Sequence, residues 1–211
     1  MRLFAYDHFN FRFIQSCVPI SGILQNYLHW TEKSLEPGVP AIHIQRTPLK
    51  TVEFALLQDL HYTHHFTNRK AVYYGPTSYS YANTSHSSSP IPTSGILSEI
   101  FNYTNYLFNN HFNSFMIHFY CNELSHMPRH SDNEKYIEEN SLILSLSYGD
   151  SRKFNVFNKN NELEKFSFML EHGDFLLMSS ASQKDFKHEL PIDKIKKSPR
   201  ISITFRKMRV E

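Results

Sequence analysis

Cysteine and long apolar runs are scarce in this chain, and each scarcity excludes certain classes of protein. Cys17 and Cys121 are the two cysteines among 211 residues. They are too few for a disulfide scaffold, so we expect a reduced intracellular setting, without distinguishing nucleus from cytoplasm. No apolar run approaches the roughly 18 residues of a membrane span, and residues 1–7 lack the apolar stretch of a signal peptide. We therefore expect no membrane partner.

An excess of one charge sign is also missing. Lysine and arginine number 22 against 20 acidic residues, a net charge of +2, and 13 histidines add charge at low pH. This mildly basic balance permits a polyanionic partner without requiring one. The length fits a single domain over 1–211 with a sizeable core, and we expect a monomer. The initial methionine favours a free-standing protein over a fragment of a polyprotein.

Short apolar segments separated by turn residues fill the second half of the chain. The predicted strands are 115–120, 142–148, 153–158, 165–170, 175–178, 186–190 and 201–207. Helical spacing of apolar residues predicts helices near 20–32 and 94–110. Many short strands with regular turns favour an α+β, mainly β fold: a double-stranded β-helix, or jelly roll, with supporting N-terminal helices.

A tyrosine-rich segment precedes the second helix. Tyr79 and Tyr81 alternate with small polar residues, which predicts a short strand with both rings on one face. The polar residues 84–90 predict a mobile loop. The two rings are equally consistent with half-buried strand aromatics. Arg69 and Lys70, which come before this segment, are candidates for phosphate contacts.

A His-x-Asp pair and a distant histidine suggest a metal site. His130 and Asp132 share a face if their segment is extended, and His188 lies on a predicted strand further along. Two histidines and a carboxylate form the facial triad of non-haem Fe(II) oxygenases, which leaves metal positions open for co-substrate and oxygen. A His-x-Asp pair alone arises easily by chance, so the inference depends on its neighbours.

Two arginines on the last predicted strand provide that context. Arg200 and Arg206 share one face with Ser202, while the alternate residues 201, 203 and 205 are apolar. Arginines inside a barrel need an anionic partner. A small dicarboxylate such as 2-oxoglutarate matches both the charge and the bidentate geometry.

Together these blocks resemble the AlkB family of Fe(II)/2-oxoglutarate-dependent nucleic-acid dealkylases over about residues 69–208. The matching blocks are Tyr120, residues 130–134, residues 144–149 with Arg152 and Phe154, residues 172–178, residues 183–188 and residues 200–206. The resemblance implies a nucleotide-recognition lid at 69–93 and a catalytic jelly-roll core at 114–208. Residues 1–68 would be an N-terminal extension with a supporting helix.

The resemblance also implies an activity: oxidative demethylation of N-alkylated bases of the 1-methyladenine or 3-methylcytosine type in DNA or RNA. The reaction uses Fe(II), 2-oxoglutarate and O2 and releases formaldehyde. The residues implied to bind iron are His130, Asp132 and His188. Those implied to hold 2-oxoglutarate are Tyr120, Arg200, Ser202 and Arg206, with Arg200 on the far carboxylate and Arg206 on the carboxylate near the metal. Those implied to face the substrate are Tyr79, Tyr81, Glu134 and Arg152.

Two departures from the family pattern leave alternatives open. The family usually has asparagine where this chain has His118 and Ser202, and both asparagines help to hold 2-oxoglutarate. We therefore expect weaker co-substrate binding. A 2-oxoglutarate oxygenase acting on a protein or small molecule, and a non-catalytic nucleic-acid binding module, remain the competing interpretations. A histidine cluster at 61–65 is a weak candidate for zinc because no cysteines accompany it.

Overall fold

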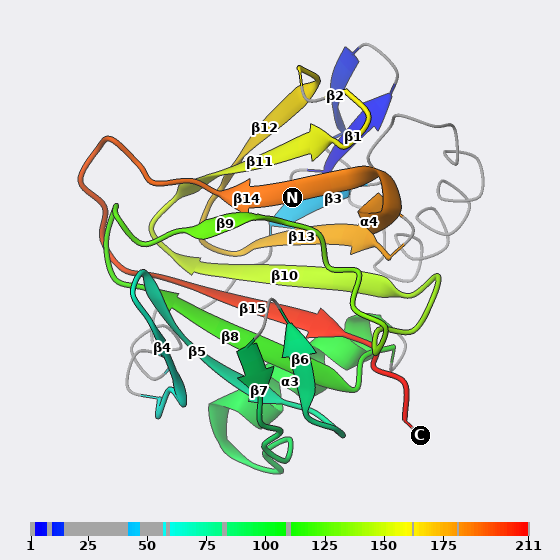
Figure 1. The fold of residues 1–211 in the computed structure, drawn as a ribbon, viewed down its shortest axis with the longest axis vertical. Coiled ribbons are helices and arrows are strands. Elements are labelled where there is room, and N and C mark those ends of the chain that lie inside the picture. Colours follow the sequence, from blue (N-terminus) through cyan, green and yellow to red (C-terminus); the bar gives the residue numbers. More distant parts are fainter. Residues whose placement is uncertain are drawn as a thin grey trace.

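Two antiparallel sheets stack to form the body of the protein (Figure 1). The computed structural model describes the backbone of residues 3–7, 10–14 and 42–46, together with residues 57, 60–81, 84–108, 111–161, 163–180 and 182–210. In spatial order, the large sheet comprises β2 (Asn10–Ile14), β1 (Leu3–Asp7), β3 (Ile42–Arg46), β13 (Asp174–Ser179), β10 (Leu142–Gly149), β15 (Arg200–Arg206), β8 (Ser114–Tyr120), β5 (Arg69–Tyr74) and β4 (His64–Phe66). The small sheet comprises β12 (Lys165–Leu170), β11 (Arg152–Asn158), β14 (Phe186–Leu190) and β9 (Met127–His130).

Alternation along β15 separates the core from the site. Ile201, Ile203 and Phe205 are fully buried on one face, where Leu97 and Ile100 of α3 (Gly95–Leu107) join the same apolar cluster. The opposite face of the large sheet packs on the small sheet through a second cluster. The polar residues of β15 therefore lie between the two sheets, in agreement with the predicted alternation of polar and apolar residues along this strand.

The predicted fold class is confirmed. Each of the seven predicted strands in the second half has an observed counterpart with ends within one residue, and the predicted helix at 94–110 corresponds to α3. The predicted helix at 20–32 lies outside the described residues. Periodicity located these elements because each one buries a single face, or for the central strands both faces, in the core.

The polar segment after the tyrosines differs from the prediction. Part of the expected mobile loop forms β7 (Thr84–His86), which pairs with β6 (Tyr79–Tyr81) as an antiparallel hairpin. Polar residues do not prevent strand formation when a partner strand is adjacent in sequence, because the backbone supplies the hydrogen bonds. The hairpin lies in front of β8 and β15 in the view of Figure 1.

Candidate metal centre and co-substrate cavity

The small sheet brings two histidines together. His130 ends β9 and His188 is its register partner on β14, with ring centroids 4.2 Å apart. Asp132 follows the end of β9, and its Oδ1 lies 3.3 Å from His130 Nε2 and 3.9 Å from His188 Nε2. The three potential ligand atoms lie within 4.8 Å of one another. The predicted triad therefore converges, although Asp132 lies just past the strand rather than on it.

Both histidines have a nitrogen available for a metal. Burial, and then the charge of His130, lowers the pKa of His188 to about 3, so its imidazole is neutral at neutral pH. His130 Nδ1 lies 2.8 Å from the carbonyl oxygen of Pro128. Because a carbonyl oxygen only accepts, Nδ1 carries a hydrogen, and Nε2 is the nitrogen that faces Asp132. Two imidazoles and one carboxylate are a donor set suited to Fe(II).

Asp132 is held in place by charge and by its backbone. Arg206 Nε and Nη2 donate to Asp132 Oδ2 at 3.2 and 2.7 Å, and the Asp132 backbone N–H donates to Gln183 Oε1 at 3.1 Å. Burial alone would raise the pKa of this carboxyl, but Arg206 and the two histidines outweigh burial and hold the pKa well below its usual range. The carboxylate is therefore ionised with one oxygen directed at the histidines.

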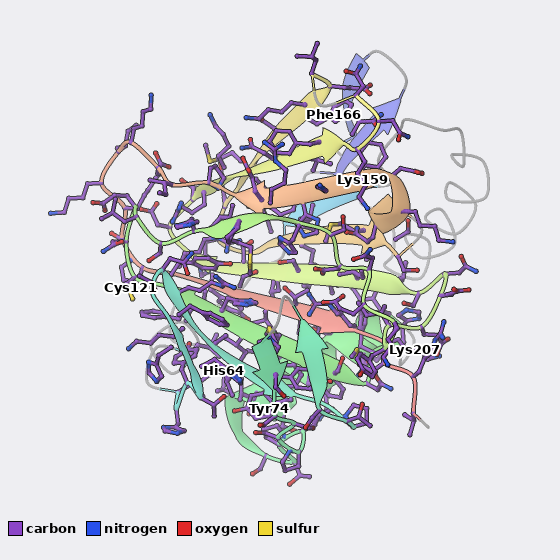
Figure 2. All side chains as sticks on the ribbon, viewed as in Figure 1. His64, Tyr74, Cys121, Lys159, Phe166 and Lys207 are labelled. Atoms are coloured by element: carbon purple, nitrogen blue, oxygen red, sulfur yellow. The ribbon has the colours of Figure 1, made fainter. Side chains whose placement is uncertain are left out.

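Arg206 thus has a partner that the sequence did not reveal. Its guanidinium pairs with the carboxylate of the candidate metal ligand, and the predicted contact with the co-substrate carboxylate near the metal stays a prediction. Gln183, on the short helix α4 (Ser182–Asp185), was part of a matched block but had no predicted role. Lys159 Nζ donates to the Gln183 carbonyl at 2.7 Å, and Figure 2 shows Lys159 beside α4.

Arg200 lies at the other end of the same strand face. Its side chain is 2% exposed, Nη2 donates to Ser147 Oγ at 2.9 Å, and its Cζ lies 5.6 Å from the ring of Tyr120. Nε is buried without a hydrogen-bond partner among the described residues. No described carboxylate lies within 4 Å of its nitrogens. Burial lowers the pKa of Arg200 to about 10 while Asp174 acts in the opposite direction, so Arg200 is a buried cation at neutral pH without a directly paired acid among the described residues.

A cavity of about 50 Å3 connects the two ends and is lined by the triad, Arg206, His118, Ser202, Tyr120 and Arg200. A single water needs roughly 10–15 Å3 by this measure, so the space suits a small molecule. Burial, and then Arg69 and Arg206, holds the pKa of His118 well below its usual value, so its ring is neutral. Ser202 Oγ lies 2.8 Å from Ser145 Oγ. The two positions that depart from the family pattern therefore both face the cavity.

Arg152 lies outside this cavity. It is fully buried, and its guanidinium donates to the carbonyl oxygens of Asn122, Ser125 and Pro191 at 3.1, 2.7 and 2.7 Å. These contacts join the β8–β9 connection to the β14–β15 connection. These hydrogen bonds give Arg152 a structural role, and the predicted contact with the substrate base stays a prediction.

The remaining predicted substrate residues lie on two sides of the cavity. Glu134 lines a neighbouring cavity of about 230 Å3 that also reaches Asp132, and burial and Asp132 raise its pKa. Arg69 lies over the ring of Phe66 at 4.2 Å, and Lys70 follows it on β5. Tyr79 and Tyr81 are the end residues of β6. The structure does not test the roles predicted for these five residues.

Comparison with known proteins places the chain in a family. Residues 23–206 match the profile of the 2OG-Fe(II) oxygenase superfamily. The chain belongs to this superfamily. Membership implies Fe(II), 2-oxoglutarate and O2, which the triad and the cavity above fit.

Individual relatives confirm the resemblance to the AlkB family. DNA oxidative demethylase ALKBH2 of Bos taurus is 29% identical over 151 residues, which cover 68% of this chain and 54% of the relative. Alpha-ketoglutarate-dependent dioxygenase alkB homolog 3 of Homo sapiens is 34% identical over 103 residues, 45% of this chain and 36% of the relative. The chain thus spans about half the length, or less, of these curated relatives.

A solved structure supports the fold assignment. The structure of OsALKBH1 aligns with a TM-score of 0.51 at 15% identity, covering 82% of this chain and 99% of that one. In the described part of the present chain, no helix is long and apolar enough to cross a membrane.

Proposed function

We propose that this protein is an Fe(II)/2-oxoglutarate-dependent dioxygenase that demethylates N-alkylated bases in DNA or RNA. The observation that carries the proposal is a single cavity with a His-Asp-His cluster at one end and an unpaired buried arginine at the other. Family membership supports the cofactor and co-substrate. The similarity to a DNA oxidative demethylase supports the nucleic-acid substrate. In this proposal residues 114–208 are the catalytic core and residues 69–93 are the lid.

His130, Asp132 and His188 would hold the iron. The protonation states of His188 and Asp132 suit the task, since the His188 imidazole is neutral and the Asp132 carboxylate is ionised. Arg206 fixes one oxygen of Asp132, and Gln183 fixes its backbone. Partners of metal ligands of this kind typically contribute about 10- to 100-fold in metal affinity.

Arg200 would bind the far carboxylate of 2-oxoglutarate. A buried arginine without a directly paired acid is unfavourable, and a carboxylate in the cavity would relieve that cost while using the Nε that has no hydrogen-bond partner. Tyr120, its register partner on β8, and Ser202 would line the same subsite. The co-substrate would then extend from Arg200 toward the triad.

The cofactor and co-substrate would supply O2 activation and oxidation of the N-methyl group, whose hydroxylated form releases formaldehyde. The chain's own residues orient the reactants and exclude water from the space between the sheets. Tyr79 and Tyr81 would stack on the extruded base, at roughly 1–3 kcal/mol per base. Arg69 and Lys70 would contact its backbone phosphates, and Glu134 would face the base from the neighbouring cavity.

The test is anaerobic loading with Fe(II) and 2-oxoglutarate, followed by exposure to air with oligonucleotides. Matched DNA and RNA strands would carry 1-methyladenine, 3-methylcytosine or no modification, and mass spectrometry would follow methyl loss. We expect loss of about 14 Da per methylated base, with succinate formed in proportion. Succinate without demethylation would indicate a protein or small-molecule substrate. Oligonucleotide binding without succinate would indicate a binding module.

A further inference from the structure

The hairpin β6–β7 is attached to the large sheet at its base. The Gly75 N–H donates to the Ser89 carbonyl at 3.0 Å, and the Ser89 N–H donates to the Tyr73 carbonyl at 3.3 Å. These bonds fix where the hairpin leaves and rejoins the chain next to β5. They do not fix how its strands lie over the sheet, because the attachment is at one end.

A second attachment comes from β4, the edge strand of the large sheet. His64 Nε2 lies 3.1 Å from the Ser85 carbonyl oxygen, and His64 Nδ1 lies 2.9 Å from Thr63 Oγ1. A carbonyl oxygen only accepts, so Nε2 donates to β7 and Nδ1 accepts from the hydroxyl in the neutral ring. Figure 2 shows His64 beside the hairpin.

Ring packing reinforces this hydrogen bond. His86 on β7 is 2% exposed, with its ring centroid 4.7 Å from that of His64 and 6.4 Å from that of Phe66. Arg69 covers the ring of Phe66 at 4.2 Å. Burial, and then His64, lowers the pKa of His86 to about 4, so the His86 ring is neutral at neutral pH.

The contact lies in line with the cavity. Across the sheet, His64 pairs with Ala71, Ala71 with His118, and His118 with Ser202. Register partners share a face of the sheet, and His118 and Ser202 line the cavity. The face of the sheet that meets the hairpin is therefore continuous with the floor of the cavity.

We propose that His64 and His86, here called the histidine latch, are positioning residues that hold the hairpin against the sheet beside the cavity. The latch thereby sets where Tyr79 and Tyr81 meet the substrate base. The substrate part of this inference rests on the proposed function. The docking part does not, because it concerns contacts within the protein alone.

Hydrogen exchange of the full-length protein loaded with Mn(II) and 2-oxoglutarate tests the docking. His64→Phe keeps a ring but removes the donor to the Ser85 carbonyl, and His86→Ala removes the buried ring. His65→Phe is the matched control, because His65 is exposed on the other face of the same strand. We expect amides of residues 84–89 to exchange at least about fivefold faster in both latch variants and at the parent rate in the control.

Steady-state kinetics tests the effect on substrate. In His64→Phe we expect the KM for methylated oligonucleotide to rise about five- to tenfold. Succinate formation without oligonucleotide, and the affinity for 2-oxoglutarate, should stay within about twofold of the parent. A merely destabilised protein would lose both activities together.

The outcomes distinguish docking of the hairpin from its role in positioning the substrate. Equal exchange rates in parent and latch variants would overturn the latch. Faster exchange with an unchanged oligonucleotide KM would overturn its role in substrate positioning. A parent that demethylates no oligonucleotide would refute the proposed function and with it the substrate part of the latch, while the exchange rates would still decide the docking.

Discussion

The two ends of the cavity differ in how their charges are satisfied. At the metal end, Asp132 is paired with Arg206 and the neighbouring His188 is neutral. At the other end, Arg200 has a serine hydroxyl and the ring of Tyr120, with no described carboxylate within 4 Å. The two arginines lie on the same face of one strand, yet one is compensated within the protein and the other is not.

This difference indicates what each end has to do before a ligand arrives. The metal end is organised in advance, because an ionised carboxylate buried alone would be too costly to keep in place. The Arg200 end keeps a positive charge that no described carboxylate pairs with directly, although Asp174 stabilises it from a distance. One end therefore holds its geometry, and the other selects the charge of what enters.

Removing a metal ligand should have the largest effect. In His130→Ala we expect metal affinity to fall by more than about 100-fold and succinate formation to become undetectable, because two ligands do not retain Fe(II). Titration with Co(II), followed by its visible absorption, measures the affinity. The control is His126→Ala, whose ring contacts the Leu124 carbonyl. Unchanged turnover in His130→Ala would contradict the metal assignment.

Arg206→Met should destabilise the protein, because it removes the ion pair with Asp132. It would leave Asp132 as a buried, unpaired carboxylate, so the metal-free protein should lose about 3 kcal/mol in its free energy of unfolding. Urea denaturation of the metal-free protein at pH 7 measures the change. A loss below about 1 kcal/mol would mean that Arg206 does not stabilise Asp132.

Arg200→Met should weaken ligand binding without destabilising the ligand-free protein. We expect affinity for 2-oxoglutarate to fall about 100-fold, whereas the free energy of unfolding of the ligand-free protein should stay equal or increase, since an uncompensated buried charge is removed. Calorimetry with the Mn(II)-loaded protein and urea denaturation without ligand measure the two quantities. A destabilised ligand-free variant would show that Arg200 has an internal partner, and the contrast between the two ends would fail.

The histidine latch allows a test of stability that needs neither the metal nor 2-oxoglutarate. The pKa of His86 is about 4, below the roughly 6.5 of an unfolded histidine. The unfolded chain therefore takes up a proton that the folded one does not, and stability that is complete above pH 6.5 falls as the pH drops toward 4. When the pH is lowered from 7 to 4.5, the free energy of unfolding of His86→Phe should fall by roughly 2 kcal/mol less than that of the parent. Urea denaturation of the metal-free proteins at both pH values measures this; equal losses would contradict it.

The smallest effect concerns the departure at Ser202. Ser202→Asn introduces an amide that donates to a carboxylate, as the AlkB family usually has there, so affinity for 2-oxoglutarate should increase about three- to fivefold. The same calorimetric titration measures it. Weaker binding in the variant would show that the hydrogen bond between Ser202 and Ser145 contributes more to the cavity than an added donor.

Local patterns predicted the strands, the triad and the face of the arginines. Period-two alternation in residues 200–206 showed which side chains share a face, and that information needs no knowledge of neighbours. The hairpin β6–β7 was only half predicted, because Thr84–His86 is polar and its strand character depends on pairing with β6. The structural contacts of Arg152 were not predicted for a related reason, since only the fold brings the loop carbonyls around its guanidinium.

The sequence by itself therefore determined the jelly-roll class, the candidate metal-binding residues and the presence of two inward arginines. The tertiary structure alone decided that Arg206 pairs with Asp132, that no described carboxylate pairs directly with Arg200, and that His64 meets His86. The physical reason is the distance along the chain over which each effect acts. Periodicity acts over a few residues, whereas charge pairing and ring packing depend on which distant strands become neighbours when the two sheets close on each other.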